Sequence, residues 1–191
     1  MQAVILAAGM GKRLGQYTQN STKCMVKVNG KTLIEYTIEA LIKANIKKLT
    51  LVVGYKSEVL KKFITSKFDQ KNLSKLEIKY IENHVYDKTN NIYSLWLAKE
   101  LLAADDTILL ESDIIFDDKI LFDMINNPNK NLAMVSHFES WMDGTCTILD
   151  DKKNIVGMID KASFNWQDIE SYYKTVNIYK LSWSLIGANY V

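Results

Sequence analysis

The 191-residue sequence predicts an α/β fold, with a mostly parallel, mixed sheet that has helices on both faces in three layers. The first observation is an alternation of elements: an apolar strand over residues 2–6, an amphipathic helix over 32–44 and an apolar, β-branched strand over 49–53. Such alternation favours parallel strands joined by helices. The second observation is that polar loops follow the apolar strands, where parallel sheets bind their ligands.

The remaining elements follow from periodicity and turn residues. Helices are predicted over 57–63, with Ser57 as the N-cap, and over 94–102. Further strands are predicted over 77–81, 107–110, 133–138, 145–149, 155–159 and 175–180. The strands 145–149 and 155–159 are predicted to form a hairpin around residues 150–154.

Length and composition limit the class of protein. The length fits one domain over residues 1–191, and the formal net charge of +2 argues against a nucleic-acid-binding surface. No apolar run approaches the roughly 20 residues that span a bilayer, so no membrane insertion is expected. Cys24 and Cys146 show no metal-ligand or redox spacing, which predicts reduced thiols and a cytoplasmic location.

The loop after the first strand carries the strongest chemical signal. Residues 4–14 read VILAAGMGKRL, so a strand runs into a loop with Gly9 and Gly11 and the cations Lys12 and Arg13. Backbone amides and cations gathered in this way favour a bound polyphosphate. The spacing matches neither the P-loop nor the dinucleotide fingerprint. Tight turns alone also need glycine, so the glycines without the cations are a weak signal.

The pattern Leu6-Ala7-Ala8-Gly9-x-Gly11-x-Arg13-Leu14, followed by Lys23 and a hydrophobic run ending in Asn29-Gly30, resembles the signature of the nucleotidyltransferases that activate sugar phosphates and phosphocholine. The family usually has proline before the lysine, where this chain has Thr22. The resemblance implies a Rossmann-like fold of the nucleotide-diphospho-sugar transferase type.

The resemblance also assigns roles to the loop residues. The backbone of Leu6, Ala7, Ala8, Gly9 and Gly11 would hold base and ribose, with Lys12 beside it. Arg13 would bind the β and γ phosphates, and Lys23 the α-phosphate.

Asp113 is the candidate metal ligand. A carboxylate at the end of a buried strand is costly unless it has a cation, and Mg²⁺ bridging nucleotide phosphates is such a cation. The alternative from spacing alone is that Asp113 caps the following turn. The resemblance implies the Mg²⁺ role, with Glu111 supporting it from the same face of the strand.

The segment from Asn90 to Leu95 indicates the type of nucleotide. It resembles the Asn-Asn-x-Tyr-Ser-Leu segment of cytidylyltransferases of the phosphocholine type, which implies that Asn90, Asn91 and Ser94 help to bind CTP. An Asn amide offers a donor and an acceptor to the cytosine edge. The alternative for Asn90 and Asn91 is a turn and an N-cap. Tyr93 and Trp96 are predicted to be core residues.

The acceptor would be bound by the later part of the chain. Lys161, after Asp160, matches in position a family lysine that contacts the acceptor phosphate; the alternative is a solvated surface lysine. Trp141 with Asp143 could hold an ammonium group by a cation–π contact and ion pairing, although core packing is the stronger expectation for Trp141.

The sequence therefore predicts an Mg²⁺-dependent cytidylyltransferase that transfers CMP from CTP to phosphocholine or 2-aminoethylphosphonate and releases pyrophosphate. The catalytic residues would be Arg13, Lys23, Asp113 and Lys161. A sugar-1-phosphate nucleotidyltransferase and a nucleotide-binding module without turnover remain alternatives. The family's second Mg²⁺-binding aspartate has no match after Glu170, so a sequence truncated at its C-terminus is a further expectation. The oligomeric state is not predicted.

Overall fold

A computed structural model describes residues 1–68 and 75–186, which divide into two compact units. The first unit contains residues 1–132 and the chain from residue 179, and the second contains residues 133–178. A single nucleotidyltransferase domain over residues 1–191 stays a prediction.

The first unit is built on parallel strands in the order β5-β4-β1-β6. Their bounds are β1 (Gln2–Ala7), β4 (Lys48–Val53), β5 (Glu77–Glu82) and β6 (Thr107–Glu111). In the central strand, Ile5 lies opposite Leu51 on one side and Leu110 on the other. All three side chains are fully buried. The strand predictions from the apolar runs are confirmed here, to within one or two residues.

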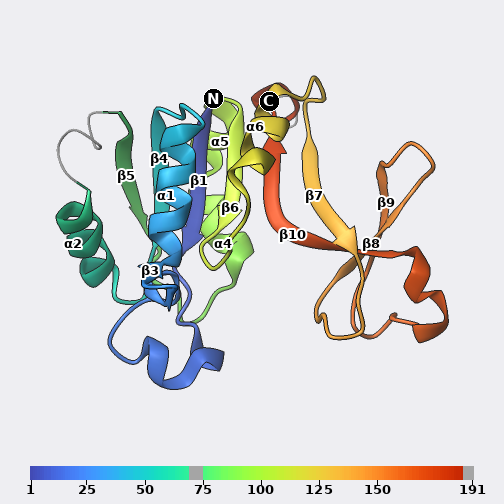
Figure 1. Cartoon of the computed structure of the whole chain (residues 1–191), viewed down its shortest axis with the longest axis horizontal. Helices are drawn as coiled ribbons and strands as arrows, with labels where there is room; N and C mark the ends of the chain where they lie inside the picture. The colour runs from blue at the N-terminus through green and yellow to red at the C-terminus, as the bar shows by residue number, and fades with distance from the viewer. Residues whose placement is uncertain (69–74, 187–191) are drawn as a thin grey trace. The chain divides into compact units, whose positions relative to one another are not determined.

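Helices flank this sheet on both faces. They are α1 (Leu33–Lys43), α2 (Ser57–Lys67), α4 (Asn91–Leu97), α5 (Lys99–Ala104), α6 (Asp118–Asn126) and α7 (Trp183–Ile186). Figure 1 shows α1 in front of the strands and α5 behind them. On one face, Ala98 and Leu102 join a buried cluster with strand residues Val4, Leu6, Val52 and Leu109. The predicted α/β architecture is confirmed.

Short elements follow β1 at the carboxyl edge of the strands, in the blue segment at the bottom of Figure 1. They are η1 (Lys12–Thr18), η2 (Lys23–Met25), β2 (Lys27–Val28) and β3 (Lys31–Thr32). β2 and β3 form an antiparallel pair whose turn residues, Asn29 and Gly30, both have positive φ angles. An Asn-Gly dipeptide adopts this conformation readily, and it brings the chain back toward α1.

Two helix predictions were wrong in detail. Ser57 is not the N-cap of α2; Lys56 takes that position in a left-handed conformation without a side-chain cap. The helix predicted over 94–102 is two helices that meet at Ala98, where φ is −90° and ψ is 6°. Ala98 is fully buried in the cluster described above, and this packing overrides its strong helix propensity.

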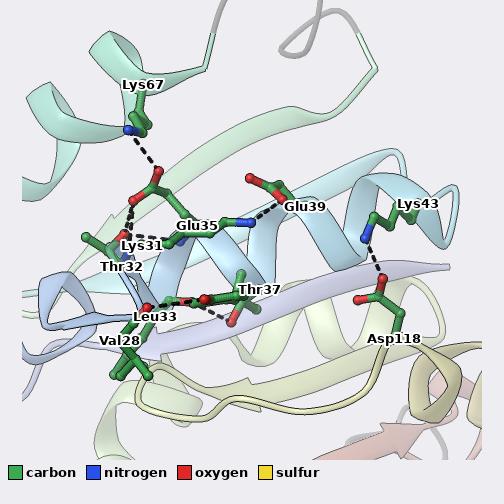
Figure 2. A network of polar contacts seen from close by, with 11 residues as sticks. Val28, Lys31, Thr32, Leu33, Glu35, Thr37, Glu39, Lys43, Lys67 and Asp118 are labelled. Carbon is green, nitrogen blue, oxygen red and sulfur yellow. Dashed lines mark hydrogen bonds and ion pairs between the residues drawn. The ribbon is translucent and has the colours of Figure 1, made fainter.

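A polar network fixes the start of α1 (Figure 2). Thr32 is the N-cap, and its backbone N–H and its hydroxyl both donate to Glu35 Oε2, at 2.9 and 2.7 Å. Lys67 of α2 pairs with the other oxygen, with 3.1 Å between Nζ and Oε1. Burial alone would raise the pKa of Glu35, but these hydrogen bonds and Lys67 lower it. The network therefore joins α1 to α2 through an ionised buried carboxylate.

The second unit is an antiparallel arrangement. Its elements are β7 (Leu132–His137), β8 (Cys146–Leu149), β9 (Ile155–Ile159), η3 (Trp166–Ser171) and β10 (Tyr172–Leu181), with the ends of β7 and β10 in the first unit. β8 pairs with β9 and with β10, which confirms the predicted hairpin. β10 is longer than the predicted strand over 175–180.

Among the described residues, no helix has the length and apolar character to span a membrane.

Candidate active site

A pocket of about 580 Å³ lies at the carboxyl edge of the first unit's sheet. Its walls come from the end of β1, the loop and η1 that follow it, the start of η2, the start of α4, and the end of β6 with the two residues after it. The lining residues are Leu6, Gly9, Gly11, Lys12, Arg13, Leu14, Lys23, Asn91, Glu111, Ser112 and Asp113. Three cations and two carboxylates thus share one opening, a composition suited to a metal-bound polyphosphate.

Gly11 lets the two cationic segments approach each other. It adopts a φ angle of 63°, and a Cβ built on it would lie 3.1 Å from the Cβ of Lys23. The loop folds around Thr18, whose buried hydroxyl donates to the carbonyls of Gly11 and Gly15 at 3.2 and 3.3 Å. Glycine at position 11 is therefore needed both for its backbone conformation and for the close packing of Lys23.

Tyr55, just after β4, ties this loop to the sheet. Its backbone N–H donates to the carbonyl of Ala8 at 3.0 Å, and its hydroxyl donates to the carbonyl of Thr18 at 3.2 Å. The ring packs edge-on against Tyr86, whose own ring lies against the backbone of Gly54. These contacts hold both ends of the loop that carries Lys12 and Arg13.

The segment of Lys23 forms a short turn without the family's proline. Thr22 has extended backbone angles, and its carbonyl accepts the N–H of Met25 at 3.0 Å. Lys23 forms an ion pair with Asp113, and the side chains of both residues are 29% exposed. The two groups predicted to bind the α-phosphate and the metal therefore contact each other directly.

Cys24 lies beside this pair without a chemical role in it. Burial raises the pKa of its thiol to about 11, and the sulfur lies 3.1 Å from the hydroxyl of Thr22. A thiol with such a pKa is protonated at neutral pH and is a poor nucleophile.

Glu111 ends β6 and lines the same pocket. Burial raises its pKa, and so does the negative charge of Asp113, while Lys23 and a hydrogen bond from Asn91 act in the opposite direction. That hydrogen bond runs from Asn91 Nδ2 to Glu111 Oε1 and is 2.7 Å long. It links the first residue of α4 to the end of β6.

The donor set fits a magnesium ion that is shared with a nucleotide. Within residues 1–68 and 75–186, no group of three or more His, Cys, Asp or Glu side chains forms a ready metal cage. Asp113 supplies a carboxylate ligand, while Glu111, two residues before it, accepts the hydrogen bond from Asn91. Mg²⁺ is commonly bound by one or two carboxylates together with substrate phosphates and water, so the residues present are sufficient.

Most of the residues predicted from the sequence meet in this pocket, but four of the nucleotide-binding candidates do not line it. Ala7 and Ala8 are buried at the end of β1. Asn90 is the N-cap of α4, where its Oδ1 accepts the N–H of Ile92. Ser94 is buried and lies 3.1 Å from the Nδ2 of Asn83, which donates to its hydroxyl.

The candidates for acceptor binding lie in the second unit. Lys161 is exposed in the turn after β9, and its binding to an acceptor phosphate stays a prediction. Asp143 Oδ1 accepts the N–H of Gly144 at 2.8 Å. Trp141 is 77% exposed, so the expectation of core packing was wrong.

Trp96, in α4 of the first unit, was also wrongly expected in the core. It is 49% exposed, stacks on Tyr93 and lies under Lys99, whose Nζ is 4.2 Å from the ring centroid. The cation over the ring replaces the apolar contacts that a core position would supply.

Sequence reasoning gave no role in the site to four residues that build it. Leu14 and Ser112 line the pocket, and Thr18 and Tyr55 hold the loop. Ser112 lies between two residues already singled out, so its position carried a signal. No local pattern in the sequence indicated a role for Tyr55, because its hydrogen bond to Thr18 joins residues 37 positions apart.

The α/β fold, with cations and carboxylates at the carboxyl edge of its parallel strands, is suited to an enzyme that binds a phosphorylated ligand. The family model described as nucleotidyl transferase matches residues 2–143. The chain belongs to the nucleotidyl transferase family and is an enzyme of that class.

The curated relatives show which members of the family this chain resembles in sequence. The chain is 30% identical to the CTP:phosphoglutamine cytidylyltransferase of Campylobacter jejuni, over 98% of this chain and 75% of the relative. It is 43% identical to the choline-phosphate cytidylyltransferase of Streptococcus pneumoniae, over 54% of this chain and 41% of the relative. It is 30% identical to the 2-aminoethylphosphonate cytidylyltransferase of Lancefieldella rimae, over 81% of this chain and 58% of the relative. The chain thus spans less than two thirds of the length of the second and third relatives.

Solved structures share the fold. The inositol-1-phosphate CTP transferase from T. maritima superimposes with a TM-score of 0.76, at 20% identity, over 99% of this chain and 73% of that one. A putative glucose-1-phosphate thymidylyltransferase from Bacillus anthracis superimposes with a TM-score of 0.77, at 18% identity, over 97% of this chain and 73% of that one. The predicted resemblance to cytidylyltransferases of the phosphocholine and aminoethylphosphonate type is confirmed by the curated relatives, and the predicted fold by the solved structures.

Proposed function

We propose that this chain is a cytidylyltransferase that transfers CMP from CTP to a small phosphate or phosphonate that carries an amino or trimethylammonium group. The observation that carries the proposal is that Lys12, Arg13, Lys23 and Asp113 line the same pocket, where Lys23 pairs with Asp113. The curated relatives support the choice of CTP and of a phosphorylated acceptor.

The reaction is a displacement at phosphorus. An oxygen of the acceptor's phosphate or phosphonate attacks the α-phosphorus of CTP, the bond to the β-phosphate oxygen breaks, and pyrophosphate leaves with the electron pair. Lys23 neutralises charge on the α-phosphate, and Arg13 neutralises charge on the β and γ phosphates. Such positioning and charge stabilisation supply most of the rate in phosphoryl-type transfers.

Asp113 would hold a Mg²⁺ ion, whose charge would offset that of the phosphates during the transfer. The chain's own contribution is to free Asp113 for that ion, which requires Lys23 to leave its present partner for the nucleotide. Lys161 in the second unit is our proposed contact for the acceptor phosphate. Phosphocholine and 2-aminoethylphosphonate remain equal candidates, since both carry a nitrogen two carbons from the oxygen or phosphorus.

A substrate screen tests the proposal. CTP, UTP, dTTP and ATP are each combined with phosphocholine, 2-aminoethylphosphonate, glutamine phosphate and glucose 1-phosphate, and pyrophosphate release is measured. We expect release with CTP and one of the nitrogen-bearing acceptors. Release with glucose 1-phosphate instead would identify a sugar-1-phosphate enzyme, and tight CTP binding without release for any acceptor would identify a binding module.

A further inference from the structure

Glu111 is out of place in a pocket that attracts phosphates. It lines the pocket at the end of β6, two residues from Asp113, and a second carboxylate there repels an anionic ligand. Lys23, which lines the same pocket, forms its ion pair with Asp113. The side-chain contact of Glu111 is instead the 2.7 Å hydrogen bond from the amide of Asn91.

An asparagine side chain that is free to rotate does not select between cytosine and uracil. Cytosine presents an amino donor at position 4 and an acceptor at N3, whereas uracil presents an acceptor and a donor at the same places. An amide that turns by 180° about its last side-chain bond exchanges its own donor and acceptor, so it pairs equally well with either base. Selection between the bases requires that something fixes the amide.

Glu111 supplies that constraint. A carboxylate accepts hydrogen bonds and does not donate them, so the amide nitrogen of Asn91 must face Glu111 and the carbonyl oxygen must face elsewhere. Asn90 is unsuited to the same role, because its Oδ1 already accepts the backbone N–H of Ile92.

We infer that Glu111 is a positioning residue that fixes the amide of Asn91 so that the pocket takes a 4-aminopyrimidine nucleotide and rejects the 4-oxo analogue. This inference rests on the proposed function, because it assumes that the base of the nucleotide reaches Asn91. It assigns to the pocket's second carboxylate a role in choosing the base, separate from the role of Asp113 toward the metal.

The test compares CMP and UMP affinities by calorimetry with a chelator present, so that metal binding makes no contribution. The wild-type chain should bind CMP more tightly. Glu111→Gln keeps the shape of the side chain but can donate or accept, which releases Asn91, so the preference for CMP should fall at least about fivefold toward equality. Glu82→Gln removes a comparable charge from the end of β5, where Glu82 pairs with Lys61, and should leave the preference unchanged.

A double-variant cycle separates positioning from general structural damage. Asn91→Ala should weaken CMP binding and remove the preference, and adding Glu111→Gln should then change neither value, because Glu111 acts through Asn91. A preference that persists in Glu111→Gln overturns the inference, and so does an effect of Glu111→Gln that survives in the Asn91→Ala background.

The outcomes also distinguish this inference from the proposed function. A wild-type chain that prefers CMP, with the same preference in Glu111→Gln, overturns the role of Glu111 alone. A wild-type chain that binds neither nucleotide overturns both. A separate Mg²⁺ titration of the CTP complex, without the chelator, identifies the competing role: an unchanged preference for CMP together with weakened Mg²⁺ binding in Glu111→Gln would make Glu111 a metal ligand and contradict the inference.

Discussion

Two acidic sites in the first unit differ in what surrounds them. At the start of α1, Glu35 is 5% exposed and receives hydrogen bonds from the backbone and hydroxyl of Thr32, with Lys67 on its other oxygen (Figure 2). In the pocket, the side chain of Asp113 is 29% exposed and pairs with Lys23. The first site is anchored in the helix start itself, and the second depends on a side chain that lines an open pocket.

We propose that this difference separates a structural carboxylate, Glu35, from a functional one, Asp113. The backbone partner of Glu35 cannot leave without unwinding the first turn of α1. In the proposed function, Lys23 moves from Asp113 to a phosphate oxygen when a nucleotide binds, and the carboxylate is then free for a metal. The comparison therefore predicts that changes at Asp113 affect turnover while changes at Glu35 affect stability.

The largest expected effect is on turnover. Asp113→Ala and Lys23→Ala should each reduce pyrophosphate release by at least about 100-fold, since each removes a charge that stabilises the transferring phosphate. Lys31→Ala is the matched control, because the Lys31 side chain is similarly exposed at 28% and pairs with Glu39 outside the pocket.

Thermal melting checks that these variants stay folded. The melting midpoints of Asp113→Ala and Lys23→Ala should remain close to that of the wild-type chain, because partly exposed ion pairs contribute little stability. Near-normal turnover in either variant would contradict its assigned role.

The next effect is on stability. Glu35→Ala should lower the free energy of unfolding by about 2 kcal/mol, because it removes the side-chain half of the capping box and takes the acceptor from the backbone N–H and hydroxyl of Thr32 and from Lys67. Glu39→Ala, one turn later on α1, should lower it by less than about 1 kcal/mol. Urea unfolding measures both. Equal losses in the two variants would remove the distinction between the two acidic sites.

The contribution of Glu35 should also depend on pH. Its pKa is lowered in the folded chain, so the stabilisation is present above the unfolded-state pKa of about 4.3 and is lost as the pH falls through the folded-state value. The difference in unfolding free energy between the wild-type chain and Glu35→Gln should therefore be constant near neutral pH and shrink below about pH 4. A difference that grows on acidification would mean that the folded-state pKa is raised instead.

The sequence predicted those parts of the site that depend on neighbours along the chain. The glycines and cations of the first loop lie within five residues, and Glu111 and Asp113 follow one strand, so local spacing was enough to group them. Parallel strand order then predicted that both groups would lie at one edge of the sheet.

The errors came from contacts that local patterns do not record. Tyr55 donates a hydrogen bond to Thr18, which lies 37 positions away in the sequence, and no periodic pattern predicts that contact. The break at Ala98 depends on packing against strands from elsewhere in the chain. Trp141 was expected in the core because tryptophan is large and apolar, but its neighbours in the fold, and not its own composition, decide its exposure.

The smallest effect tests how closely Lys23 must approach the loop that carries Arg13. Gly11→Ala places a Cβ 3.1 Å from both Lys23 Cβ and Thr18 Cγ2, at a φ of 63° that alanine rarely adopts. We expect CTP binding to weaken several-fold, with a loss of about 1 kcal/mol in unfolding free energy. Calorimetry and urea unfolding measure the two effects.

Gly15→Ala separates strain from displacement of the lysine. Gly15 also has a positive φ, of 51°, but a Cβ there has no heavy atom within 4 Å, so alanine brings backbone strain without a clash. It should lose a similar amount of stability while keeping most of its affinity for CTP. If Gly15→Ala weakens CTP binding as much as Gly11→Ala does, the conformation of the loop matters and the approach of Lys23 does not. The cation at position 23 would then be placed by its own turn, from Thr22 to Met25, and the close packing at Gly11 would have only a structural role.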